Sequence, residues 1–366
     1  YVGASPEKIH NDQLKWETSE QTNIGLDSRF MNFSFTFDIY QKVTKDWLLI
    51  APVSDLAGTD APTINGGDVR NQGLEFMLAY YNQIGDFNFN ISGNMAFNKN
   101  EVLRIDNPEG LINGEDNQLF HGHSEVYRAE VGFPIGYFYG YKVDGIFQDT
   151  TEISAHSHNG EPIQPRAVPG DVRFVDVNDD GTIDGDDRTL IGNPHPDFTY
   201  GFNFDCSYKG FDFSVLLHGV YGNEILYGYR AEERAISNYT ADVLDRWTGP
   251  ETSNERPRVT TGSESNQNYK RISELYIEDG SYLKIRALTI GYDFGRGLLG
   301  NLELLSQFRI YVSAQNLFTF TKYPGYDPEV GYGDLDETRY ENYSIGIDNG
   351  YYPTPRIFLA GLNLKF

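Results

Sequence analysis

The residues with the clearest chemical pattern lie between positions 176 and 187. The segment reads Asp-Val-Asn-Asp-Asp-Gly-Thr-Ile-Asp-Gly-Asp-Asp, with oxygen-bearing side chains at its first, third, fifth, seventh, ninth and twelfth positions. This alternation is typical of a calcium loop, because Ca²⁺ takes about six to eight oxygen ligands, and alternate residues can direct their oxygens inward. The candidate ligands are Asp176, Asn178, Asp180, Thr182, Asp184 and Asp187.

Two further positions agree with a calcium loop, and one departs from it. Gly181 stands where the loop must turn sharply, and Ile183 stands where an apolar anchor is usual. Asp187 takes the place of the bidentate Glu, as it does in dockerin-type loops. The alternative interpretation is an acidic surface turn rich in Asp and Gly. A catalytic role is not expected, because no nucleophile lies nearby in the sequence.

Other patterns that could support metal binding or catalysis are weaker. His121 with His123, and His156 with His158, form two pairs whose members would share one face of a strand. Neither pair has a third ligand at usable spacing, so we do not predict a metal site at either. The sequence contains no GxSxG, HExxH or GxxxxGK[ST] motif. It therefore predicts no enzyme, no catalytic residue and no organic cofactor.

Composition excludes several other classes. Among 366 residues, 53 are acidic and 29 are basic, which gives a formal charge of −24 and speaks against nucleic acid as a partner. The single cysteine, Cys206, excludes an internal disulfide framework. No run approaches the ~18 apolar residues of a membrane helix. The sequence opens at Tyr1 with neither an initiator Met nor a basic–apolar leader, which we interpret as a mature product or a fragment.

The elements that must position these residues are strands. Aromatic residues make up 14% of the chain, and apolar and polar residues alternate with a period of two, as in Phe33, Phe35 and Phe37. Several candidate strands reach the ~9–11 residues that cross a bilayer. The eleven candidates are 16–27, 32–44, 73–82, 87–98, 124–131, 137–147, 198–208, 211–222, 282–294, 307–319 and 356–366.

The connections between these strands alternate in length. Short connections fall near 28–31, 83–86, 132–136 and 209–210, and long ones at 45–72, 99–123, 148–197, 223–281 and 320–355. Tight periplasmic turns and large outer loops are typical of an outer-membrane barrel, whose strands turn apolar residues to lipid and polar ones to the lumen. We predict an all-β, antiparallel transmembrane β-barrel. Its eleven strands would be half of a barrel of ~22 strands.

Two alternatives stay open from the pattern alone. One is a soluble or surface β-rich protein, a lectin or adhesin in which calcium orders a glycan site. The other is a self-contained porin of ten or twelve strands. In the half-barrel interpretation, counting strands back from Phe366 in the periplasm places residues 1–15 in an outer loop. We then expect the chain to begin at a break in such a loop.

Many motifs, in one order, resemble SusC-like TonB-dependent transporters. The resemblance runs from about Trp16 to Phe366. The motifs are Leu14-Lys-Trp-Glu-Thr18, Gln21-Thr-Asn-Ile-Gly-Leu-Asp27, Asn71-Gln-Gly-Leu-Glu75, Gly132-Phe-Pro-Ile-Gly136, Phe138-Tyr-Gly-Tyr141, Asp144-Gly-Ile-Phe-Gln148, Pro169-Gly-Asp171, Asp245-Arg-Trp-Thr248, Ser281-Tyr-Leu-Lys-Ile-Arg286 and Ala314-Gln-Asn-Leu317.

The resemblance implies an outer-membrane importer of glycans or peptides in Bacteroidetes-type bacteria. Such proteins work with a SusD-like surface lipoprotein and take energy from the TonB complex through a plug domain. Residues 1–366 would be the C-terminal part of the barrel, because no plug and no first half are found in the sequence. The remaining part of the transporter, on a separate chain, and the outer-membrane lipid would then be further partners.

Three remaining features each allow two interpretations. Residues 230–247 carry a helical pattern of Ile236, Tyr239, Val243, Leu244 and Trp247, ended by Gly249-Pro250, which predicts a helix packed on its own loop or a contact for the lipoprotein. Phe366 resembles a terminal assembly signal or simply ends the last strand. A set of aromatic residues predicts a membrane girdle or sugar-stacking platforms: Tyr137, Phe138, Tyr139, Tyr141, Tyr227 and Tyr229.

Overall fold

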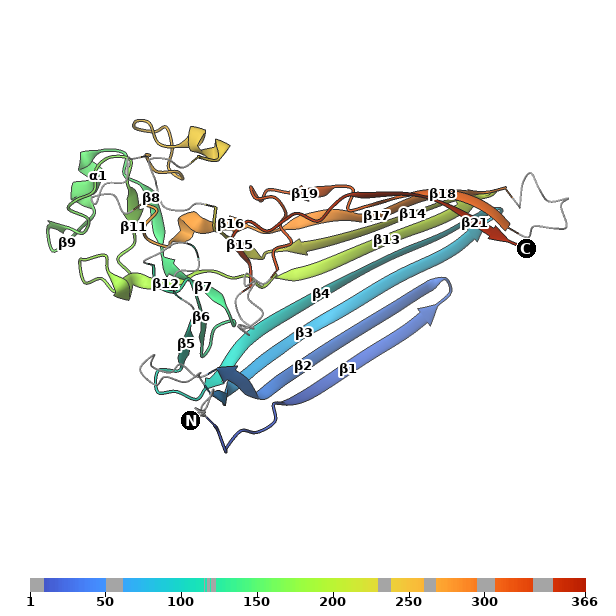
Figure 1. Ribbon diagram of the computed structural model, residues 1–366, viewed down its shortest axis with the longest axis horizontal. Coiled ribbons are helices and arrows are strands. Elements are labelled where there is room, and N and C mark those ends of the chain that lie inside the picture. Colours follow the sequence, from blue (N-terminus) through green and yellow to red (C-terminus); the bar gives the residue numbers. More distant parts are fainter. Residues whose placement is uncertain are drawn as a thin grey trace, which may run out of the picture.

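The computed structural model describes residues 10–50, 62–114, 116, 119, 123–229, 238–259, 268–294, 307–331 and 345–366. Its main element is a ten-stranded antiparallel sheet of long strands (Figure 1). The order along the sheet is β1 (Thr18–Phe30), β2 (Phe33–Ile50), β3 (Thr63–Ile84), β4 (Phe87–Ile105), β13 (Phe198–Tyr208), β14 (Phe211–Tyr221), β17 (Tyr282–Asp293), β18 (Gln307–Gln315) and β21 (Ile357–Lys365), and β19 (Thr319–Thr321) also pairs with β17.

Tight turns lie together at one end of this sheet, and the long connections leave from the other end (Figure 1). Each described turn uses a residue in the left-handed region: Met31 (φ 52°), Gly85 (φ 61°) and the pair Lys209 and Gly210 (φ 45° and 92°). Such values suit short hairpin turns, whose twist matches that of the strands. The predicted alternation of short and long connections is confirmed for these three hairpins.

The strand register places the apolar residues of neighbouring strands on one continuous face. Phe35 is opposite Leu78, Leu78 is opposite Gly93, and Gly93 is opposite Phe202. Phe35 is 37% exposed and Phe202 is 39% exposed. Cross-strand partners share a face of the sheet. The apolar face is therefore open and does not form a sealed core of the kind that a soluble β-protein requires.

Aromatic rings gather on this face near the tight turns. The ring of Phe33 lies 4.5 Å from that of Tyr80, and Phe87 lies 6.5 Å from Tyr208. The ring of Phe211 in β14 lies 4.5 Å from that of Tyr292 in the neighbouring strand β17. Outer-membrane barrels carry such aromatic girdles where the apolar band meets the polar interface. These residues, rather than the ones that the sequence singled out, form the girdle at this end.

The long connections leave the opposite end of the sheet, and we call their described residues within 106–197, 223–281 and 322–355 the loop assembly (Figure 1). It contains four small sheets. Their strands are β5 (Leu111–Asn113), β6 (Tyr127–Glu130), β7 (Tyr137–Tyr141) and β12 (Arg188–Gly192); β8 (Val143–Ile146) and β11 (Val172–Phe174); β9 (Ser157–His158) and β10 (Glu161–Pro162); and β15 (Glu224–Tyr227), β16 (Ile277–Asp279) and β20 (Ile347–Asp348).

Two predicted membrane strands belong to this assembly instead. Segments 124–131 and 137–147 form the short strands β6, β7 and β8, and 132–136 is a turn within the loop assembly. Tyr127 and Phe138 are fully buried there, with Ile191 and Tyr276 in the same cluster. Alternating aromatic residues give the same sequence pattern whether one face of the strand contacts lipid or a protein core. The pattern therefore could not distinguish these two segments from membrane strands.

Burial also excludes a membrane-girdle role for several of the aromatic residues that the sequence indicated. Tyr137, Phe138, Tyr139 and Tyr227 are buried within the loop assembly. They are therefore not girdle residues, and their buried faces are not available to stack on a sugar. Part of the hydrophobic core thus lies within the loop assembly, and another part packs Trp47, Val69 and Val102 of the sheet strands against Ala129.

Helical structure in the described residues is short. The elements are α1 (Thr150–Ala155) and the 3₁₀ turns η2 (Gly185–Asp187), η3 (Ala241–Asp245) and η4 (Glu274–Tyr276). Of the predicted helix at 230–247, the described part holds η3, whereas 230–237, with Ile236, lies outside the described residues. None of the described helices has the length and apolar character needed to cross a membrane.

Candidate functional site

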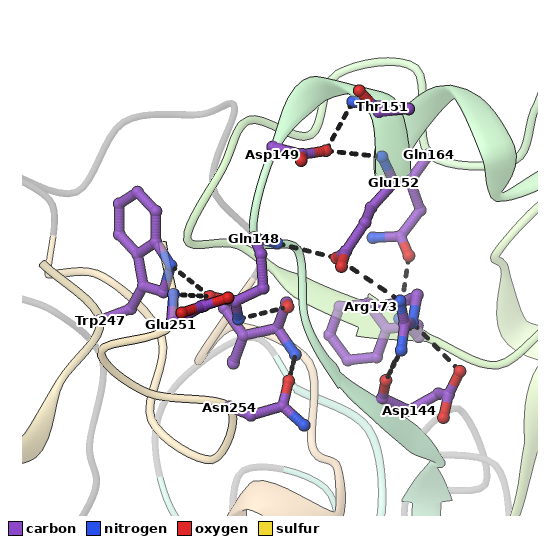
Figure 2. Close-up of polar contacts among 12 residues, drawn as sticks. Asp144, Gln148, Asp149, Thr151, Glu152, Gln164, Arg173, Trp247, Glu251 and Asn254 are labelled. Atoms are coloured by element: carbon purple, nitrogen blue, oxygen red, sulfur yellow. Dashed lines mark hydrogen bonds and ion pairs between the residues drawn. The ribbon is translucent and has the colours of Figure 1, made fainter. Parts of the chain in front are cut away.

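Two of the sequence motifs meet at one glutamine in the loop assembly (Figure 2), and a third motif, Pro169–Asp171, packs against Trp247 beside them. Gln148, which ends the Asp144–Gln148 motif, accepts hydrogen bonds from Trp247 Nε1 (3.1 Å) and from the backbone N–H of Glu251 (2.8 Å). Its amide nitrogen donates to the carbonyls of Ile146 (2.9 Å) and Ser253 (3.0 Å). The side chain thus joins segments about a hundred residues apart in the chain.

The glycines of these motifs are needed because the backbone passes close to other groups. Gly170 has φ +91°, and a Cβ placed there would lie 2.5 Å from the ring of Trp247. Gly145 also has φ +91°, and its Cβ would lie 2.6 Å from Asn254 Oδ1. L-residues with side chains rarely adopt such φ values. The motif spacing therefore encodes close packing of three segments.

Two charged residues, Asp149 and Arg173, connect α1 with the strands β8 and β11. Asp149 caps α1 by accepting from the N–H groups of Thr151 (2.8 Å) and Glu152 (2.9 Å) (Figure 2). Arg173 donates through Nε to the carbonyl of Asp144 (2.9 Å) and lies 3.7 Å from Glu152. These contacts fix β8, β11 and α1 relative to one another. They give this part of the loop assembly a defined shape.

The predicted calcium loop follows β11 and adopts a tight fold. Asp176 accepts from the N–H of Gly181 (2.8 Å), and Asp180 accepts from the N–H of Thr182 (2.9 Å). Gly181 has φ +88°, as the sharp turn requires. Asp187 is 0% exposed. Its two oxygens accept from the N–H groups of Val177 (2.8 Å) and Asp184 (2.8 Å).

The metal-type groups that approach one another most clearly are a different set. Within the described residues, ligand atoms of His158, Asp176 and Asp179 lie within 4.8 Å of one another. Asp176 is the member that this set shares with the predicted ligands. His158 comes from β9 and lies over Gly181, 3.1 Å from where a Cβ would stand. The structure thus brings one histidine of the second HxH pair to the loop, which sequence spacing did not indicate.

Its companion in that pair lies elsewhere. The His156 ring packs on Phe147, with 5.6 Å between ring centroids. Burial, followed by the nearby Arg173, lowers the pKa of His156. In the first pair, His123 is described, and His121 lies outside the described residues. The structure therefore does not bring His156 and His158 together as a metal pair.

A group of ion pairs that the Ser281–Arg286 motif did not by itself predict lies on the polar face of the sheet. Lys284 of β17 is opposite His218, which is opposite Gly201, which is opposite Asn94, so its side chain shares the polar face. Lys284 is 1% exposed, and its Nζ lies 3.1 Å from Asp327 Oδ1 and 2.5 Å from Glu329 Oε2. Arg286 also donates to Glu329. We call Lys284, Arg286, Asp327 and Glu329 the Lys284 cluster.

The rest of this face is polar as well. Ser214 donates to Asp205 (2.6 Å), and Arg309 donates to Asp212 (2.7 Å). The hydroxyls of Thr289 and Ser313 lie 2.9 Å apart. One face of the sheet is thus hydrogen-bonded and suited to water, while the other is apolar. This is the arrangement of a transmembrane barrel wall.

Comparison with known proteins agrees with this architecture. Residues 2–121 match the family described as TonB dependent receptor-like, beta-barrel. The chain is 35% identical to TonB-dependent receptor P3 of Formosa agariphila, with 97% of this chain and 35% of that protein aligned. It is 30% identical to SusC of Bacteroides thetaiotaomicron, over 100% of this chain and 34% of that protein.

Solved structures show the same fold. The RagAB peptide transporter superposes with a TM-score of 0.72 at 21% identity, covering 98% of this chain and 36% of that one. The open-open state of the RagAB peptide importer gives 0.73 at 22% identity, covering 100% and 36%. The chain spans about a third of the length of the curated relatives that it matches.

The open amphipathic sheet, its girdle and its loop assembly, together with these matches, make the chain part of a TonB-dependent receptor β-barrel of the outer membrane. The family and the relatives that match are TonB-dependent receptors and not enzymes. Within the class, the chain belongs to the SusC-like receptors.

Proposed function

We propose that this chain forms part of the wall and outer loops of an importer for glycans or peptides. The observation that carries the proposal is the sheet itself, with an open apolar face on one side and a hydrogen-bonded polar face on the other. A SusD-like lipoprotein would cover the loop assembly, and the TonB complex would act through a plug. The names of the RagAB structures, which refer to peptides, support the peptide class, and the motifs shared with SusC-like transporters are the reason for proposing such a lipoprotein.

The two outer strands of the sheet support the idea that further strands complete the barrel. All thirteen residues of β1 are exposed, and β1 and β21 stand at the two ends of the strand order. The unpaired N–H and C=O groups of an edge strand favour aggregation, and closing the sheet into a barrel removes such edges. We therefore expect further strands of the barrel to pair with both edges.

The orientation of the sheet can be tested at two adjacent positions. Phe202→Arg places a charge on the apolar face and is expected to lower the free energy of unfolding in lipid by about 2–4 kcal/mol. Asn203→Arg is the matched control, because Asn203 lies on the polar face beside Asp205, where a guanidinium stays solvated. Unfolding of the complete barrel in vesicles, followed by heat-modifiable gel mobility, measures both. Equal costs would contradict the proposed orientation, as would a monodisperse wild-type protein without detergent.

We also propose that residues 176–187 bind Ca²⁺ and so stiffen the loop assembly. The support is chemical: the alternate side chains are oxygen donors, and Asp176 stands at the start of the loop beside both Gly181 and the His158 group. The candidate ligands are those that the sequence predicts, although Asp187 directs both of its oxygens to backbone N–H groups. Its role would then be to shape the loop as much as to bind the ion.

Calcium is expected to stabilise the loop assembly by about 2.7 kcal/mol when present at a hundred times its dissociation constant. Asp176→Asn should abolish this gain, because it removes a charged ligand. Asp186→Asn is the control, since Asp186 lies in the same loop outside the ligand pattern. Calorimetric titration and thermal unfolding in Ca²⁺ and in Mg²⁺ measure the effect. An acidic surface turn would give no saturable heat and equal behaviour of the two variants.

A further inference from the structure

A cavity of about 420 Å³ lies in the loop assembly beside the predicted calcium loop. Its lining comes from the segments 163–167, 171–174, 182–183 and 268–271. Ile163, Ile183 and Phe174 provide apolar wall, and two arginines, Arg166 and Arg271, provide charge. Ligand pockets combine apolar walls with a few polar groups that fix orientation, and their volumes start at about 300 Å³.

Arg271 is the distinctive group of this cavity. Its guanidinium lies between the rings of Tyr141 (5.1 Å) and Phe174 (5.2 Å), which hold it in place. Nη2 donates to the carbonyl of Ile183 (2.9 Å). Burial lowers the pKa of Arg271, yet an arginine stays charged at neutral pH and offers five N–H donors. One fixed arginine thus presents unused donors to the cavity.

No carboxylate of the described residues forms an ion pair with Arg271 or with Arg166. The acidic residue that lines the cavity, Asp171, is already bound by Arg258 (2.7 Å) and by Asn268 (3.2 Å). In a chain with a formal charge of −24, other partly buried arginines, such as Arg128 and Arg309, pair with a carboxylate. Asp187 and Asp184 act on Arg271 from beyond ion-pair distance, so its guanidinium is left without a direct anionic partner in the described residues.

We propose that this cavity binds a compound carrying a carboxylate, with Arg271 holding the carboxylate and Arg166 at the exposed rim. The planar guanidinium matches a carboxylate with two parallel hydrogen bonds. The apolar walls would contact the body of the ligand, and the volume suits one or two residues of a peptide or sugar. Two sources share this chemistry: the C-terminus of a peptide and a uronic acid. The proposal does not depend on transport, because it concerns binding to the loop assembly.

The test compares charged and neutral twins on the complete receptor in detergent. The probes are N-acetyl-alanyl-alanine against its C-terminal amide, and glucuronic acid against glucose, followed by calorimetry. We expect at least one carboxylate to bind about ten-fold or more tightly than its neutral twin, because a charge-assisted hydrogen bond is lost in the twin. The pair that shows the difference identifies the source. Equal affinities, or no binding of either acid at 10 mM, would overturn the proposal (~10 mM corresponds to the weakest useful affinity).

Two variants locate the binding. Arg271→Met should reduce carboxylate affinity about ten-fold or more, and the exposed Arg166→Gln should reduce it about three-fold while leaving the fold intact. Arg246→Gln is the matched control, because Arg246 is also half-buried and also donates to a single carbonyl, that of Val243 (3.1 Å). If Arg246→Gln weakened binding as much as both cavity variants, or if neither cavity variant weakened it, the cavity would not be the site.

Discussion

Replacing Lys284 by methionine is expected to lower the free energy of unfolding of the complete barrel by about 3–5 kcal/mol, the cost of removing one partner from a buried charge network. Lys284 lies between Asp327 and Glu329, and its side chain is 1% exposed. Without the ammonium, two carboxylates remain close together away from water. Arg286 can still bind Glu329, but Asp327 keeps no cation within ion-pair distance in the described residues.

The same substitution should loosen the segment around Asp327. Asp327 also accepts from the N–H groups of Thr354 (3.0 Å) and Glu329 (3.2 Å), so it fixes the chain on both sides of residues 332–344. Chemical denaturation in detergent or lipid gives the free energy, and limited proteolysis between 322 and 331 reports the local loosening. We expect faster cleavage there than in the wild type.

A compensated variant separates charge from packing. Lys284→Met combined with Asp327→Asn neutralises the carboxylate left without a cation, while Glu329 keeps Arg286, and should recover most of the lost stability, because replacing both partners is far less costly than removing one. If the single variant lost less than about 1 kcal/mol, the network would behave like an exposed one. The Lys284 cluster would then not be what holds this segment to the polar face of the sheet.

Gly170→Ala is expected to destabilise the loop assembly by about 2–5 kcal/mol, combining the cost of a side chain at positive φ with a steric conflict. The new methyl group would lie 2.5 Å from the Trp247 ring. The backbone around it cannot move freely, since the Gly170 N–H donates to Phe147 (2.7 Å) and its carbonyl accepts from Arg258 (2.8 Å). The segments that Gln148 and Gly170 hold against Trp247 would therefore separate.

Gly160→Ala is the matched control for this prediction. Gly160 has φ +87°, close to the +91° of Gly170, but a Cβ there would meet no atom within 4 Å. It should therefore show the conformational cost alone, about 1–2 kcal/mol. Hydrogen exchange of β8 and β11, together with Trp247 fluorescence, compares the two. Equal effects would mean that the contact with Trp247 does not hold the motifs together.

The membrane sheet could be predicted from the sequence to a large extent. Alternation along Phe33, Phe35 and Phe37 is a local property, because successive side chains of a strand point to opposite faces and each face contacts a single environment. The short turns at Met31, Gly85 and Gly210 are local as well. The calcium pattern from Asp176 to Asp187 is equally local, since its proposed ligands fall within one loop, and calcium binding there stays a prediction.

Tertiary structure decided what happens between the membrane strands. Phe138 stands in a run of aromatic residues typical of a girdle, yet it is buried in a cluster with Leu226, Tyr276 and Ile347, which are distant in the sequence. Lys284 meets Asp327 and Glu329 across 43 and 45 residues, and Gln148 meets Trp247 across 99. The position of Arg271 beside Ile183 depends on a contact across 88 residues. The two-residue period of apolar side chains determines which side of a strand contacts water or lipid. Only folding brings distant residues together, and it therefore determines which charged side chains are buried, ion-paired or available to a ligand.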